Sequence, residues 1–86
     1  MAVYQVVVSA AAAKNLEKLP VPVVGRIVTA LQGLEQNPRP SGCKKLKGFD
    51  NLWRIRVGDY RVLYAIEEQI LLVDVRAAGY RKDIYG

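Results

Sequence analysis

A glycine–aspartate pair between two β-rich runs is the feature that most constrains this chain. Residues 58 and 59 separate the runs 52–57 and 60–66, and Gly-Asp fits a two-residue hairpin turn. Such a turn fixes the register of the two strands. The expected cross-strand pairs are Val57–Tyr60, Arg56–Arg61, Ile55–Val62, Arg54–Leu63 and Trp53–Tyr64. Because side chains alternate along a strand, one face of the hairpin collects the apolar and aromatic side chains of the expected core: Trp53, Ile55, Val57, Tyr60, Val62 and Tyr64.

The opposite face of the hairpin carries three arginines: Arg54, Arg56 and Arg61. Arg56 and Arg61 are expected directly opposite each other, where like charges are destabilising. Since arginine stays protonated, either a carboxylate compensates or the face binds an anion. A two-residue turn at 67–68 would place Asp74 opposite Arg61 as that carboxylate. Guanidinium groups match phosphate oxygens in bidentate geometry, which favours an anion; a solvated, salt-bridged face is the structural alternative.

The rest of the chain predicts one α+β domain over residues 1–86. An uncharged run at 3–8 predicts a strand, and Ser9 can cap a helix over 10–19. Three- and four-residue spacing of apolar side chains predicts a second helix that ends near Gln36: Val24, Ile27, Val28, Leu31 and Leu34. After a turn at 37–42, strands are expected at 52–57, 60–66 and 70–76. This order predicts an N-terminal strand, a two-helix hairpin and a three-stranded antiparallel meander, which form one sheet with both helices packed on one face.

Composition limits the chemistry available to the chain. It has no histidine and one cysteine, Cys43, so it can form no internal disulfide, and we expect no metal site and no cofactor. Without histidine, catalysis must rely on Lys, Arg, Tyr, Asp or Glu. No apolar run is long enough to span a membrane, and the start does not resemble a signal peptide. We therefore expect a cytoplasmic protein that does not act at a membrane.

The positive charge is concentrated in the middle of the chain. The net charge is +5, and residues 41–61 carry six basic and two acidic side chains, a net +4. This distribution indicates a polyanion or an acidic protein as partner. Near the C-terminus, Arg81 and Tyr85 follow Gly79. An aromatic ring beside guanidinium groups can stack on a base while its phosphate is held, although Tyr85 could equally pack on the core.

The string LKGFDNLWRIRVGDYRVLYAIEEQILLVDVRAAGYRKDIY resembles the RelE/ParE superfamily, the toxins of bacterial and archaeal toxin–antitoxin pairs. The likeness extends through the N-terminal half, from the first strand through the NPRP turn to the KKLKG segment. The WRIRVGDYRVLY hairpin is specific for the superfamily, but it does not separate ribosome-dependent mRNA endonucleases (RelE-like) from gyrase poisons (ParE-like).

The resemblance implies a toxin that is silenced by an antitoxin protein and that cuts mRNA in the ribosomal A site. The RNA 2′-hydroxyl would be the nucleophile, and no metal would be needed. The RelE pattern of functional residues is matched by Arg54, Arg56, Arg61, Arg81 and Tyr85. Arg56 and Arg61 would hold the scissile phosphate with help from Arg54, Arg81 would lie near the leaving 5′-oxygen, and Tyr85 would contact the nucleotide.

Three lysines, Lys44, Lys45 and Lys47, would bind flanking ribosomal RNA phosphates, although they could equally form a generic basic loop. In RelE itself, lysines usually stand where this chain has Arg54 and Arg56. Because arginine does not accept a proton, the general base stays unassigned. Filled RelE positions favour the nuclease branch. The alternatives are a ParE-like inhibitor of DNA gyrase and an inactive homologue that only binds its antitoxin.

Overall fold

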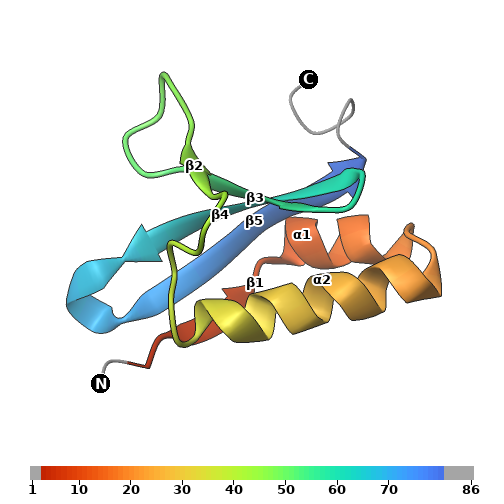
Figure 1. Ribbon diagram of the computed structural model, residues 1–86, viewed down its shortest axis with the longest axis horizontal. Helices are drawn as coiled ribbons and strands as arrows, with labels where there is room; N and C mark the ends of the chain where they lie inside the picture. Colours follow the sequence, from red (N-terminus) through yellow and green to blue (C-terminus); the bar gives the residue numbers. More distant parts are fainter. Residues whose placement is uncertain (1–2, 81–86) are drawn as a thin grey trace.

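The computed structural model describes residues 3–80, which form a five-stranded sheet with two helices on one face (Figure 1). The strands are β1 (Gln5–Val8), β2 (Lys44–Lys45), β3 (Trp53–Val57), β4 (Tyr60–Glu67) and β5 (Leu72–Tyr80). The helices are α1 (Ala10–Glu17) and α2 (Val21–Leu34). The sheet order is β1-β5-β4-β3-β2, with β1 parallel to β5 and the other pairs antiparallel. The expected α+β fold, with the helices on one face, is confirmed.

Local sequence explains where the helices begin and end. The Ser9 hydroxyl accepts a hydrogen bond from the Ala12 amide at 3.1 Å and caps α1, as predicted. Pro22 occupies the first turn of α2, where a missing amide hydrogen costs nothing. Both helices end about two residues before their predicted limits. In α2, the amides of Glu35 and Gln36 bond to carbonyls three residues back, which tightens the chain out of the helix.

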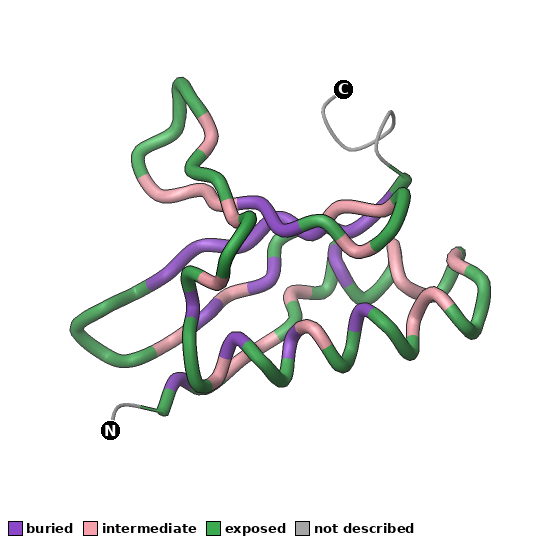
Figure 2. Tube along the Cα trace, viewed as in Figure 1, coloured by how far each residue is buried: buried purple, intermediate pink, exposed green. Residues whose placement is uncertain are grey.

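The core lies between the sheet and the helical hairpin, which connects β1 to the rest of the chain. Figure 2 shows buried residues on the central strands and on the side of α2 that faces them. The largest fully buried side chains among residues 3–80 come from α2, β4 and β5: Ile27, Leu34, Val62, Tyr64, Val73 and Val75. On the hairpin, Ile55, Val62 and Tyr64 belong to this core, and Trp53, Val57 and Tyr60 pack against it, as alternation predicted.

The β3–β4 hairpin has the expected register in full. Trp53 pairs with Tyr64, Arg56 with Arg61 and Val57 with Tyr60. Gly58 has φ of 60°, a left-handed conformation that glycine adopts without a steric penalty. The sequence of the turn therefore fixes which side chains share each face of the sheet.

The two-residue turn at 67–68, which would have placed Asp74 opposite Arg61, does not form between β4 and β5. A 3₁₀ turn at Glu68–Ile70 and a left-handed Leu71 replace the two-residue turn, and β5 begins at Leu72. Asp74 consequently pairs with Ala65, whereas the backbone partner of Arg61 is Gly79. The register also shifts between Leu63 and Tyr64 through a bulge.

The short strand β2 was not predicted, because two lysines carry no β signal of their own. Lys44 pairs with Arg54 and Lys45 with Trp53, and the Leu46 amide donates to the Leu52 carbonyl at 2.8 Å. Residues 46–52 form a loop, which we call the arm, that rises from the sheet face opposite the helices (Figure 1). Neither helix among residues 3–80 is long and apolar enough to cross a membrane.

Candidate functional site

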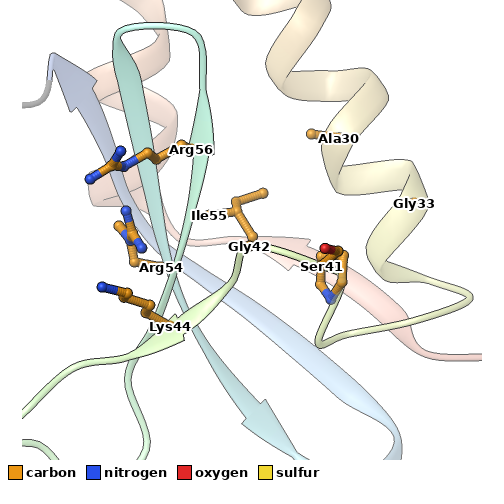
Figure 3. Close-up of a pocket in the computed structure, with 9 residues that line it drawn as sticks. Ala30, Gly33, Ser41, Gly42, Lys44, Arg54, Ile55 and Arg56 are labelled. Atoms are coloured by element: carbon orange, nitrogen blue, oxygen red, sulfur yellow. The ribbon is translucent and has the colours of Figure 1, made fainter.

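Four basic side chains share the sheet face opposite the helices. The ladder partners Lys44–Arg54 and Arg56–Arg61 place these residues side by side on β2, β3 and β4, and we call them the cationic face. In Figure 3, the side chains of Lys44, Arg54 and Arg56 project together away from α2, whereas Ile55 points toward that helix. The pairing places Lys45 beside Trp53, on the other face, and Lys47 is exposed on the arm. The structure therefore brings four of the predicted residues together and separates two lysines from them.

Arg54 is the unusual member of the cationic face because it is only 4% exposed. Within residues 3–80, ion pairs join Arg39 to Glu68 and Arg76 to Asp74, and no carboxylate of this part of the chain neutralises Arg54, Arg56 or Lys44. The Asp74 carboxylate, which was considered as the counter-charge of Arg61, lies 3.5 Å from the Arg76 guanidinium instead. A buried cation among like charges is costly in the free protein, and an anion would relieve that cost.

Two hollows border the cationic face. A small polar hollow, with a volume of about 170 Å³, lies at the hairpin turn and is lined by Arg56, residues 58–60 and Arg61. A larger groove of about 490 Å³ lies between α2, residues 40–42 and β3. Ala30 and Ile55 contribute apolar walls to this groove, and Lys44, Arg54 and Arg56 line its other side (Figure 3). The groove suits a ligand that combines apolar and anionic groups.

A side-chain clamp holds the loop that forms one wall of this groove. The Arg39 guanidinium donates to the Glu68 carboxylate and lies 4.7 Å from the centre of the Trp53 ring. The Tyr4 hydroxyl donates to the same carboxylate at 2.8 Å. Tyr4 first, then Arg39, lower the pKa of Glu68 through these hydrogen bonds, and the carboxylate in turn raises the pKa of the Tyr4 hydroxyl.

Two buried hydrogen-bond networks support the same loop and the base of the arm. The Tyr64 hydroxyl donates to the Pro38 carbonyl at 2.7 Å, and burial raises the pKa of this hydroxyl. Asn51 donates to the Ile66 carbonyl and accepts from the Trp53 indole and the Ile66 amide. Sequence reasoning identified the loop only as a turn, because nothing local to residues 37–42 signals partners 26 or more positions away.

Two of the predicted catalytic residues, Arg81 and Tyr85, lie outside the described residues. Within residues 3–80, no three His, Cys, Asp or Glu side chains gather in a way that could hold a metal ion. What the described part of the site offers is positive charge, partly desolvated, beside an apolar groove.

Comparison with known proteins places this arrangement in a family. A model described as "ParE toxin of type II toxin-antitoxin system, parDE" matches residues 6–84. Toxin RelE of Mycobacterium tuberculosis is 34% identical over 84 residues, covering 91% of this chain and 87% of the relative.

Solved structures give the same answer. The archaeal RelE-RelB complex from Pyrococcus horikoshii matches with a TM-score of 0.82 and 28% identity, covering 94% of this chain and 98% of the matched chain. The toxin-antitoxin complex RelBE2 from Mycobacterium tuberculosis matches with a TM-score of 0.81 and 27% identity, covering 92% and 99%. The chain therefore belongs to the RelE/ParE superfamily of type II toxin–antitoxin toxins, and within it is RelE-like.

Proposed function

We propose that this toxin is an endoribonuclease that cuts mRNA on the translating ribosome. The observation that carries the proposal is the burial of Arg54 among other cations. No carboxylate of residues 3–80 neutralises Lys44, Arg54 or Arg56. A face built in this way is prepared for phosphate before the substrate arrives, which is how preorganised charge lowers a barrier. A toxin that acts on ribosomes would work in the cytoplasm.

The proposed reaction is an in-line transfer within the RNA. The 2′-oxygen forms a bond to the scissile phosphorus, the bond from phosphorus to the 5′-oxygen breaks, and the products are a 2′,3′-cyclic phosphate and a 5′-hydroxyl. The proton leaves the 2′-hydroxyl for a base, and the leaving 5′-oxygen gains a proton. Arg56 and Arg61 hold the non-bridging oxygens as negative charge grows on them, and Arg54 orients the same phosphate. Because arginine does not release or accept a proton at neutral pH, none of these three residues is the base.

The proposed protein partner is an antitoxin, as in the RelE-RelB complexes that the chain resembles. We expect an antitoxin segment with acidic and apolar side chains, because the cationic face and the adjoining groove present the complementary surface. Binding there would neutralise the arginines and cover the site at once.

The test is induced expression followed by mapping of mRNA 5′ ends, with and without translating ribosomes. We expect cuts inside codons only when ribosomes are present. Arg56→Ala and Arg61→Ala should abolish the cuts and the growth arrest, whereas Lys14→Ala, which removes an exposed cation from α1, should retain both. Retention of full cleavage by both site variants, with the same unfolding midpoint as the wild type, would refute the proposal.

Inhibition of DNA gyrase is the second candidate, because the matching family model is that of ParE toxins. Intact mRNA together with blocked DNA supercoiling would move the protein to this class. Harmless expression without the antitoxin would instead indicate a homologue that only binds its partner.

A further inference from the structure

The arm carries an exposed aromatic side chain that the core does not need. Phe49 is 58% exposed and lies next to Gly48, whose φ of 84° turns the chain at this point. Lys47 precedes this turn, and Lys44 and Lys45 stand at the base of the arm. A single exposed phenylalanine needs no explanation by itself, but Phe49 also lines a cleft with other apolar side chains, and a contiguous apolar surface of this kind can bind a ligand.

A cleft lies between the arm and the sheet face opposite the helices. Its volume is about 320 Å³. Phe49 and Leu52 line it from the arm, and Leu63 and Ala65 line it from β4. Leu63 and Ala65 are only 7% and 6% exposed, yet they lie outside the core cluster, because their side chains are on the other face of the sheet.

The cleft adjoins the cationic face through one cross-strand pair. Leu63 is the direct cross-strand partner of Arg54, so the apolar lining of the cleft begins beside the buried guanidinium. Arg76 also lines the cleft and is paired with Asp74 at 3.5 Å. A ligand that fills the cleft therefore has an apolar, ring-sized part beside Phe49 and an anionic part within reach of arginine.

This combination is the chemistry of a nucleotide in single-stranded RNA. Aromatic side chains stack on bases of unpaired RNA while cations follow the phosphates. We propose that the cleft binds the base of a nucleotide that flanks the scissile phosphate, with Phe49 as its stacking surface; this inference rests on the nuclease function proposed above. The base lies between Phe49 and the wall made by Leu63 and Ala65, and its phosphate lies toward Arg54.

The polar groups at the cleft give it the means to discriminate between bases. Asp50 and Arg76 line the cleft and offer an acceptor and a donor to a base edge. Asn51 also lines it, but its amide is already bonded to Ile66 and Trp53 and positions the arm. The cleft is therefore expected to set a sequence preference at one nucleotide position, separate from the phosphate contacts that cleave.

The test is a double-substitution cycle between Phe49 and the mRNA, read as single-turnover cleavage on programmed ribosomes. Messages carry an abasic ribose at one position at a time around the scissile phosphate. The proteins are the wild type, Phe49→Ala, Phe49→Trp and a control, Ile70→Ala. The control removes a side chain that is 68% exposed in the turn between β4 and β5.

For the wild type, we expect one abasic position to lower the cleavage rate by about 5- to 150-fold, the range given by loss of one stacked base. Phe49→Ala should lose a similar factor on the intact message and nothing more at that abasic position. Phe49→Trp should retain cleavage, and Ile70→Ala should match the wild type at every position.

Two outcomes would overturn the inference and leave the nuclease proposal standing. One is cleavage by Phe49→Ala at the wild-type rate; the other is abasic effects that are the same in both proteins. If Phe49→Ala instead weakens only binding of the antitoxin, the cleft belongs to the protein partner and the inference is wrong. Absence of any cleavage by the wild type removes the proposed function itself.

Discussion

Replacing Arg54 with methionine should make the free toxin more stable and less active. Methionine keeps most of the length of the side chain and its apolar contacts, but it removes a charge that is 4% exposed. Two like charges stand beside it, Lys44 across the ladder and Arg56 on the same face of β3. For two unit charges about 7 Å apart, Coulomb's law gives a repulsion of roughly 0.6–2.4 kcal/mol for effective dielectric constants between 80 and 20.

Desolvation of the guanidinium adds to this repulsion, and Arg54 has no carboxylate of residues 3–80 to offset it. Replacing buried ion pairs with well-packed apolar side chains is often neutral or stabilising, by up to about 4 kcal/mol, and a buried charge without a partner lacks even the attraction within a pair. We expect a gain of about 1–3 kcal/mol in the free energy of unfolding for Arg54→Met. In a domain of this size, each kcal/mol raises Tm by about 4–8 °C.

Urea unfolding at two sulfate concentrations measures this gain and its origin. The wild type should gain more stability from sulfate than Arg54→Met, because an anion that binds the folded state stabilises it. Arg56→Met is the matched control: it removes the same repulsion between Arg54 and Arg56, but Arg56 is exposed and carries no comparable desolvation cost, so this variant should gain less unfolding free energy than Arg54→Met. Cleavage by Arg54→Met should fall by about 30-fold or more, the effect of losing roughly 2 kcal/mol of a buried charge contact. A variant that is less stable than the wild type, or equally responsive to sulfate, would show that Arg54 is already satisfied within the free protein.

Three further changes test the framework around the site. Tyr64→Phe leaves a buried backbone carbonyl without its donor, so urea unfolding should show a loss of about 1–3 kcal/mol, and an unchanged midpoint would contradict this. Hydrogen bonds from Tyr4 first and Arg39 second lower the pKa of Glu68 in the folded protein. The ionised carboxylate therefore stabilises the fold at pH values above its unfolded pKa of about 4.3. This stabilisation is lost as the pH falls through the lower pKa of the folded state. Thermal melts from pH 6 to pH 2 should therefore separate the wild type from Glu68→Gln, whose stability should lack this acid dependence. Gly58→Ala should cost about 1–2 kcal/mol, because φ is 60° there, while Gly58→Asn should cost less; equal melting temperatures for the two variants would exclude backbone strain as the cause.

The β3–β4 hairpin could be predicted because one local signal determines all of it. Once Gly58 and Asp59 form the turn, a period of two assigns every side chain to a face, and no distant residue is needed. The same logic failed for β4 and β5, where Glu-Glu carries no comparable turn signal. The chain uses a 3₁₀ turn and a left-handed Leu71, and a bulge then shifts the register again. Neither event has a local sequence signature, so the partner of Asp74 could not be inferred.

The grooves around the cationic face were beyond sequence reasoning for a related reason. Each depends on contacts between segments far apart in the chain, such as Arg39 with Glu68 and Asn51 with Ile66. Sequence alone gave residue types at the right places on β3 and β4, including the charge. It did not show that Arg54 is buried, because burial depends on how segments far apart in the chain pack, and the strand that pairs with Arg54, at Lys44 and Lys45, has no strand signal.

The arm links stability to function through the central strand. β4 lies between β3 and β5, and its side chains are buried on both faces of the sheet. The helices cover one face, where Val62 and Tyr64 lie in the core. On the other face, Leu63 and Ala65 line the cleft beneath the arm. A small domain has no third layer with which to cover this face of the sheet. The arm therefore has two roles: it shields the apolar side chains of β4 and it borders the cationic face. Shortening the arm would therefore expose Leu63 and lower stability, and it would also remove one wall of the cleft; the two losses arise from the same contacts.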